Sequence, residues 1–120
     1  MELINKTVTI RLKGTKHYGA RDAYRRNVLY EGKALECEAE PQNTHDRNAV
    51  SLWIGKTKLG YINRDLAEKY QKLILAKQLT SCTISSVDLA RNGAKVEIYV
   101  KISYKDDVKV SIQDDCDIPN

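Results

Sequence analysis

The sequence predicts an all-β-rich domain with a minor helical part, built as a small barrel of about six or seven short strands and one or two helices. Three observations lead to this prediction. Apolar and polar residues alternate along most of the chain, turn residues separate the alternating segments, and a single segment has helical periodicity. A chain of 120 residues is long enough to bury one core, so we expect one domain.

The strands are predicted where alternation places every second side chain on an apolar face. Alternation runs through residues 7–12, 35–39, 50–54, 58–62, 82–87, 96–103 and 108–112. Gly55 and the Asn92-Gly93 pair supply turn residues for two hairpins. A closed or nearly closed barrel of the OB or SH3-like kind would protect the edges of so many short strands.

One segment departs from the alternation. Its apolar residues recur at helical spacing, at Leu66, Ala67, Tyr70, Leu73 and Ile74. Asn63 precedes them at the position of an N-terminal cap. We expect a helix over about residues 64–78 that closes one end of the barrel.

Residues 13–32 show no clear period and combine glycines with basic and tyrosine side chains. We predict a long basic loop here, with one helical turn near Arg21 to Arg26. Residues 113–120 are acidic and include Pro119. The domain is therefore expected to span residues 1–112, followed by an acidic tail.

Basic residues outnumber acidic ones in the first two thirds of the chain. Residues 1–80 contain 15 lysines and arginines against nine acidic residues, whereas residues 81–120 contain five against seven. Such an excess suits a polyanion such as nucleic acid, although many domains carry one without binding a charged partner. The charge distribution alone does not identify the kind of ligand.

The three cysteines, Cys37, Cys82 and Cys116, are widely spaced and have no histidine at zinc-ligand spacing. We expect reduced thiols, the first two packed in strands, and no metal or cofactor. No apolar run approaches the length of a membrane span, and the N-terminus does not resemble a secretory signal. These features predict a soluble intracellular, cytoplasmic protein.

The densest polar cluster occupies residues 40–50, between two predicted strands. Pro41 restricts the backbone, while Asn43 and Asp46 have side chains that commonly bond to neighbouring backbone groups in turns. The residues by themselves are compatible with a rigid, self-bonded connection. They are equally compatible with a binding loop.

The cluster has the form E-P-x-N-x-x-D-x-N-A-V, and it is followed by Leu59-Gly60-Tyr61-Ile62 and a helix near Arg64. This order of motifs resembles the signature of HIRAN domains. Upstream, Lys16-His17-Tyr18 occupies the place of that family's basic and aromatic residues. The resemblance covers residues 7–87. It implies an OB-like barrel that binds the 3′ ends of single-stranded DNA without catalysis, in DNA repair, replication or recombination.

The resemblance also implies roles for individual residues. Asp46 would accept a hydrogen bond from the terminal 3′-hydroxyl, and its charge would repel a 3′-phosphate. Asn43 would hold the loop and bond to the end nucleotide. The terminal bases would stack against Tyr18, His17 and His45, and the phosphates behind the end would bind Lys16, Arg64 and the Tyr61 hydroxyl.

The sequence departs from the family pattern at four positions. His17 and His45 replace tyrosines, Ala39 replaces a frequent arginine, and Thr44 replaces a frequent proline. An imidazole offers less stacking area than a phenol and titrates near neutral pH, so end capture is expected to be weaker or pH-dependent. Trp53 is expected to pack beneath the 13–32 loop and is left out of the site.

Two other functions remain open. Glu40, His45 and Asp46 resemble part of a metal-dependent nuclease site, although such sites draw carboxylates from several elements. A protein-interaction adaptor could keep the same barrel without end binding and use the basic loop to contact a partner. The family module is often fused to a motor or nuclease, so a helicase or nuclease partner is also expected.

Overall fold

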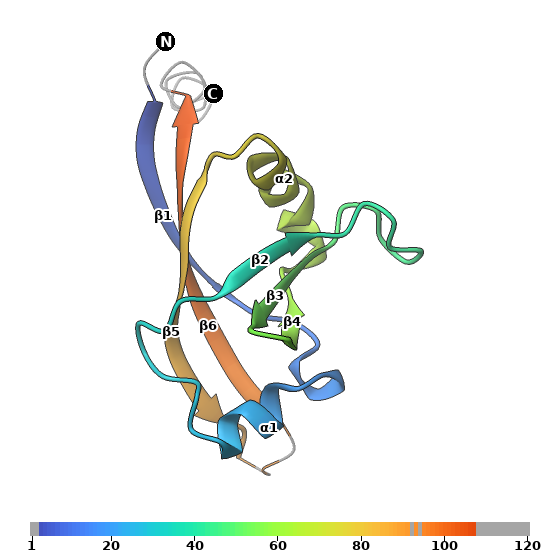
Figure 1. Ribbon diagram of the computed structural model, residues 1–120, viewed down its shortest axis with the longest axis vertical. Coiled ribbons are helices and arrows are strands. Elements are labelled where there is room, and N and C mark those ends of the chain that lie inside the picture. The colour runs from blue at the N-terminus through green and yellow to red at the C-terminus, as the bar shows by residue number, and fades with distance from the viewer. Residues whose placement is uncertain (1–2, 92, 94, 108–120) are drawn as a thin grey trace, which may run out of the picture.

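The computed structural model describes residues 3–91, 93 and 95–107, in which six strands form two antiparallel three-stranded sheets (Figure 1). The first sheet contains the long strands in the order β1-β6-β5, and the second contains the short strands in the order β2-β3-β4. Their bounds are β1 Leu3–Arg11, β2 Glu36–Ala39, β3 Val50–Ile54, β4 Thr57–Tyr61, β5 Leu79–Leu89 and β6 Val96–Asp107.

Both predicted hairpins are confirmed. The strands β3 and β4 pair in antiparallel fashion across a turn at Gly55, which has a φ of 59°. The strands β5 and β6 pair in the same way, and Gly93 in their connection has a φ of 72°. Asn92, the predicted strand 108–112, the predicted tail 113–120 and Cys116 lie outside the described residues.

The predicted helix is confirmed as α2, Arg64–Leu75. Asn63 caps it, because its side-chain oxygen accepts a hydrogen bond of 3.1 Å from the Asp65 backbone N–H. The helix ends three residues earlier than expected, just before Lys77 adopts a left-handed φ of 58°. The 13–32 segment contains a 3₁₀ turn, η1 Thr15–His17, and a short helix, α1 Ala20–Arg25, which confirms the predicted helical turn.

The predicted barrel is confirmed only in part, because the described residues form two sheets and no closed barrel is detected among them. Within the described residues the two sheets are joined through isolated bridges, Lys13 with Tyr61 and Ala34 with Thr83, and not through a continuous ladder. The strands β5 and β6 are 11 and 12 residues long, so they extend beyond the second sheet, whose strands have four or five residues. The second sheet lies across the first (Figure 1).

The helix α2 contacts both sheets. It packs against β2 and β3 of the short sheet and against β5 of the long one. Its buried Tyr70 meets Tyr104 of β6 edge to face, with ring centroids 5.9 Å apart. This contact ties the helix to the long sheet.

One core forms between the two sheets. Apolar side chains on the inner faces of both are fully buried, among them Val50, Leu52 and Leu59 from the short sheet and Ile98, Val100 and Ile102 from the long one. Cys82 is buried and Cys37 half-buried, both as free thiols packed in strands as predicted. A hydrogen bond to Cys37, together with burial, raises the pKa of the Cys82 thiol. Cys82 is therefore a neutral thiol inside the core.

Gly60 allows the two sheets to approach each other. Lys13 and Tyr61 exchange backbone hydrogen bonds of 2.8 and 2.9 Å across this junction. A Cβ atom at position 60 would lie 2.6 Å from the Lys13 carbonyl oxygen, which is closer than side chains pack.

Replacing Gly60 by Ala is expected to lower the free energy of unfolding by about 1–3 kcal/mol, because one of the two sheets must shift to admit the methyl group. Urea unfolding followed by circular dichroism would measure the change. Ser81→Ala, at an exposed position on β5, is the matched control and is expected to change little. Equal stabilities for Gly60→Ala and the wild type would contradict the close approach.

Candidate nucleic-acid interface

The loop of residues 40–49 connects β2 to β3 and projects from the body of the domain (Figure 1). Backbone hydrogen bonds close it at its base and again within it. The Glu40 N–H donates to the Ala49 carbonyl at 2.9 Å, and the Ala49 N–H donates to the Asp46 carbonyl at 3.1 Å. The polar cluster is thus an ordered turn, as one of the two interpretations of the sequence expected.

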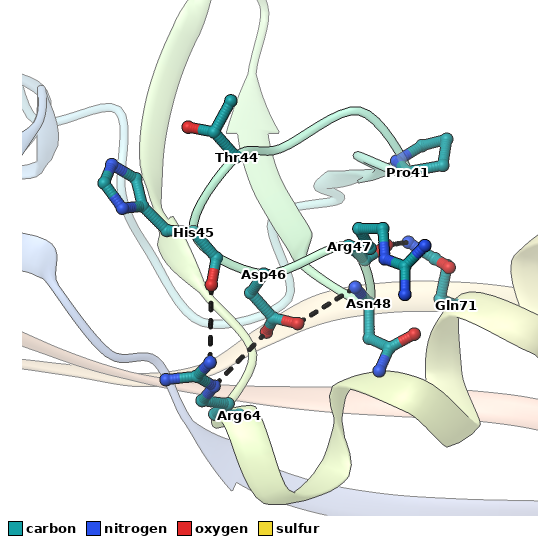
Figure 2. A pocket seen from close by; sticks show the side chains of 8 residues that line it. All are labelled: Pro41, Thr44, His45, Asp46, Arg47, Asn48, Arg64 and Gln71. Atoms are coloured by element: carbon teal, nitrogen blue, oxygen red, sulfur yellow. Dashed lines mark hydrogen bonds and ion pairs between the residues drawn. The ribbon is translucent and has the colours of Figure 1, made fainter.

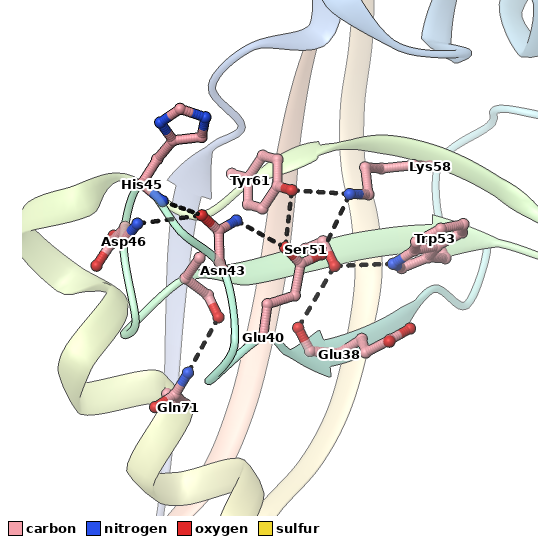
Figure 3. Close-up of polar contacts among 11 residues, drawn as sticks. Glu38, Glu40, Asn43, His45, Asp46, Ser51, Trp53, Lys58, Tyr61 and Gln71 are labelled. Carbon is pink, nitrogen blue, oxygen red and sulfur yellow. Dashed lines mark hydrogen bonds and ion pairs between the residues drawn. The ribbon is translucent and has the colours of Figure 1, made fainter.

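Asn43 organises the tip of this loop (Figure 3). Its amide nitrogen donates to Glu40 Oε1 at 2.9 Å, and its oxygen accepts from the His45 and Asp46 backbone N–H groups at 2.8 and 3.1 Å. Asp46 in turn accepts from the Asn48 N–H at 2.9 Å through Oδ1. These bonds orient the Asp46 carboxylate before any ligand is bound.

The helix α2 holds the other side of the loop (Figure 2). The buried amide of Gln71 donates to the carbonyls of Arg47 and Ala49 at 2.9 and 3.2 Å. Arg64 donates to the His45 carbonyl at 3.3 Å, and its Nε lies 4.0 Å from Asp46 Oδ2. The Arg64 side chain is 78% exposed, so this contact leaves the guanidinium open to an anionic ligand.

A lysine surrounded by aromatic rings lies beneath the loop. Lys58 Nζ donates to the Tyr61 hydroxyl at 2.7 Å and lies 3.2 Å from Glu40 Oε2. It is also 4.8–5.3 Å from the ring centroids of Tyr18, Trp53 and Tyr61, within cation–π range. The Tyr61 hydroxyl donates to Glu40 Oε1 at 2.9 Å. We call Glu40, Lys58 and Tyr61 the support cluster.

The support cluster keeps Glu40 ionised. Burial by itself would raise the pKa of the Glu40 carboxyl, but hydrogen bonds from Ser51, Asn43, Tyr61 and Lys58 outweigh burial and lower the pKa to about 2. The same bonds to Tyr61 and Glu40 raise the pKa of Lys58 against the opposing effect of its burial. The pair therefore remains charged across the neutral range.

The stabilising effect of the Glu40 charge should disappear in acid. A carboxyl whose pKa falls on folding stabilises the native state fully above its ordinary pKa near 4.5, and this effect is lost as the pH falls toward 2. We expect the stability difference between the wild type and Glu40→Gln to be constant above about pH 5 and to shrink below pH 4.5. Urea unfolding at several pH values, followed through the single tryptophan, would test this. A difference unchanged down to pH 3 would contradict it.

The loop, Tyr61 of the support cluster and the start of α2 surround a hollow of about 410 Å³. Tyr18 is 42% exposed at this hollow, and its ring meets that of Tyr61 edge to face, with centroids 5.6 Å apart. A hollow of this size, with aromatic and polar walls, is in the range of small-ligand pockets. The lining residues are Lys13, Tyr18, Asn43, His45, Asp46, Ala49, Tyr61, Ile62, Asn63 and Arg64.

The fold brings most of the residues singled out in the sequence to this hollow, namely Tyr18, Asn43, His45, Asp46, Tyr61 and Arg64. Lys16 and His17 line a smaller neighbouring hollow instead. The Tyr61 hydroxyl was expected to contact a phosphate, but it already forms hydrogen bonds with Lys58 and Glu40.

Sequence reasoning missed Lys13 and Lys58. Lys13 belongs to the basic 13–32 segment, but only its bridge to Tyr61 places it at the hollow. The alternation of residues 58–62 predicts a strand at Lys58 and gives no sign of a role at the site. Trp53 is half-buried beside Lys58, with its indole N–H bonded to Ser51 at 2.8 Å, and it does not line the hollow.

The described residues also bear on the other functions that the sequence left open. No group of three histidine, cysteine, aspartate or glutamate side chains is arranged there as metal ligands. Glu40 and Asp46, the acids of the imagined nuclease site, bond to different partners, Glu40 to the support cluster and Asp46 to its own loop. Neither helix in this part of the chain has the length and apolar composition of a membrane span.

Comparisons with known proteins agree with this description. The family model of the HIRAN domain matches residues 6–113. The crystal structure of the HIRAN domain of human HLTF is similar with a TM-score of 0.64 at 13% identity, over 86% of this chain and 78% of that chain. A crystal structure of a protein from Lactobacillus plantarum is similar with a TM-score of 0.61 at 23% identity, over 84% and 99%. The comparison with curated proteins gave no match.

Proposed function

Because this chain belongs to the HIRAN domain family, whose members are generally non-catalytic binding modules, we propose that it captures the free 3′-hydroxyl end of single-stranded DNA. The family binds DNA ends. The observation that most supports the proposal is the Asp46 carboxylate, which lines the 410 Å³ hollow and is oriented by the surrounding loop. We place the function in DNA repair, replication or recombination.

Asp46 supplies the chemistry of end recognition. One carboxylate oxygen accepts the Asn48 N–H, and the other lies at the 4.0 Å limit of a contact with Arg64, so it keeps acceptor capacity. A terminal 3′-hydroxyl can donate its proton to that oxygen. A 3′-phosphate in the same position would bring two negative charges together in a partly buried place, where their repulsion is poorly screened.

Aromatic side chains hold the terminal base. Tyr18 and His45 line the same hollow from different segments of the chain, and His17 meets Tyr18 edge to face, with ring centroids 6.4 Å apart. Stacking on such rings accepts any base, because every base has a π-face. Tyr61 serves mainly as the support of Tyr18, since its hydroxyl has partners inside the protein.

Basic side chains around the hollow bind the phosphates behind the end. Arg64 and Lys13 line the hollow, and Lys16 is exposed beside it. Contacts of this kind position the strand and add salt-dependent affinity without reading its sequence.

The test compares the affinities of three single strands of equal length by fluorescence anisotropy: one with a free 3′-hydroxyl, one with a 3′-phosphate and one closed into a circle. The wild type should bind the first at least about tenfold more tightly than the second. Asp46→Ala should lose most of this preference, whereas Asp88→Ala, an exposed acid on β5, should keep it. Equal wild-type affinity for all three strands would exclude end capture, however tight the binding.

A protein-interaction adaptor remains the second candidate, favoured by the exposed basic and aromatic surface around α1. Tyr24 is 37% and Tyr30 55% exposed there, beside the exposed Arg21 and Arg25. A helicase or nuclease presenting acidic side chains would suit that surface. This candidate predicts equal affinity for linear and circular single strands.

A further inference from the structure

A second hollow, of about 160 Å³, lies beside the first and has mostly basic walls. Lys13 lines both hollows. The other basic residues of the second are Arg11 at the end of β1, Lys16 and His17 in η1, and Lys95 just before β6. We call this hollow the basic cleft. Its residues come from two parts of the chain that are about 80 positions apart in sequence.

The positive charge of the basic cleft is largely uncompensated. Arg11 lies 3.4 Å from Glu97 Oε1, which makes one ion pair at the edge of the cleft. No ion pair of Lys13, Lys16 or Lys95 is found among the residues that the structure describes. Cations held close together repel one another, and a bound anion relieves this repulsion.

Hydrogen bonds hold the backbone segments that form the basic cleft. The buried Thr15 hydroxyl donates to the Val96 carbonyl at 2.6 Å, which joins η1 to the start of β6. The Leu12 N–H donates to the Ile98 carbonyl at 2.8 Å, and Lys13 pairs with Tyr61. These bonds position the cations before binding, so little ordering of the backbone opposes association.

We propose that the basic cleft binds a backbone phosphate of the same strand whose 3′-terminal nucleotide occupies the first hollow. This proposal rests on the function proposed above. The strand would pass Lys13, the residue shared by the two hollows, and continue toward the start of β6. The cleft has less than half the volume of the first hollow and cationic walls, which suits a phosphodiester better than a base.

Lys95→Ala tests the proposal, because Lys95 lines the cleft but not the first hollow. Its backbone carbonyl accepts a hydrogen bond from the Ala90 N–H, and the substitution leaves that carbonyl in place. The affinities of two 5′-labelled strands with free 3′-hydroxyls, three and ten nucleotides long, would be measured at several salt concentrations. The variant should bind the short strand as the wild type does. It should bind the long strand roughly threefold to tenfold more weakly, with a salt slope reduced by about 0.7.

Two matched variants sharpen the result. Lys95→Arg keeps the charge and should restore binding of the long strand. Lys56→Ala removes an exposed lysine in the β3–β4 turn, outside both hollows, and should change neither affinity.

Three outcomes would overturn the proposal: an unchanged affinity of Lys95→Ala for the long strand, an equal loss for both lengths, or a loss equally large on a circular strand. A failure of the proposed 3′-end function would give a different result. The wild-type protein would then bind linear and circular strands with equal affinity.

Discussion

Replacing Tyr18 by Ala is expected to weaken the binding of a strand with a free 3′ end by roughly five- to 150-fold, because stacking contributes about 1–3 kcal/mol per base. Tyr18 is exposed at the hollow while its ring is supported by Tyr61, 5.6 Å away, and by the Lys58 ammonium, 5.2 Å away. The ring is therefore held in place without a ligand. The loss should be similar for all terminal bases.

The controls for this prediction separate stacking from folding. Tyr18→Phe keeps the ring and should bind nearly as the wild type does. Tyr24→Ala removes a tyrosine of similar exposure on α1, outside the hollow, and should have no effect. Fluorescence anisotropy gives the affinities and thermal unfolding checks that each variant is folded. Wild-type affinity in a folded Tyr18→Ala protein would show that the terminal base does not stack on this ring.

Replacing Lys58 by Met is expected to lower the free energy of unfolding by about 1–3 kcal/mol, because it leaves Glu40 ionised in a mostly buried place without its counter-charge. The side chains of Lys58 and Glu40 are 22% and 17% exposed, so water screens their charges only in part. The end preference should fall as well, since Glu40 holds Asn43 and Asn43 holds Asp46. Urea unfolding and the comparison of 3′-hydroxyl with 3′-phosphate strands measure the two effects.

A double-mutant cycle tests whether the two charges act together. The double variant Lys58→Met/Glu40→Gln should lose less free energy of unfolding than the two single variants lose together, by at least about 0.5 kcal/mol. The reason is that the double variant buries no unpaired charge. Lys56→Met, at the exposed turn, should change the free energy of unfolding little. Strict additivity of the two single changes would argue against a coupled support cluster.

Local features of the structure could be predicted because their causes are close in sequence. The helix α2 follows from apolar spacing and the Asn63 cap, and both hairpins follow from their alternation and turn residues. The self-bonded 40–49 loop follows in the same way, since Asn43 and Asp46 bond to backbone groups two or three residues away. The matching motifs along the chain also predicted the family.

Alternation predicted the strands but not their division into two sheets, because it shows which face of a strand is buried but not which strand lies beside it. The strands β5 and β6 extend beyond the predicted segments, and isolated bridges join the short sheet to the long one in place of a continuous ladder. Strand partners depend on contacts between distant residues. A pattern along the chain does not contain them.

The sequence by itself determined the helix, the hairpins and the polar loop that contains Asn43 and Asp46, because short-range hydrogen bonds and periodic burial specify such elements. Only the tertiary structure decided that Lys58 lies beneath Tyr18 and Tyr61, and that Lys13 and Lys95 share one cleft. These groups meet because two sheets close on a common core and approach each other at Gly60. Local pattern therefore predicts the recognition loop, whereas the packing of the sheets arranges the charges around it.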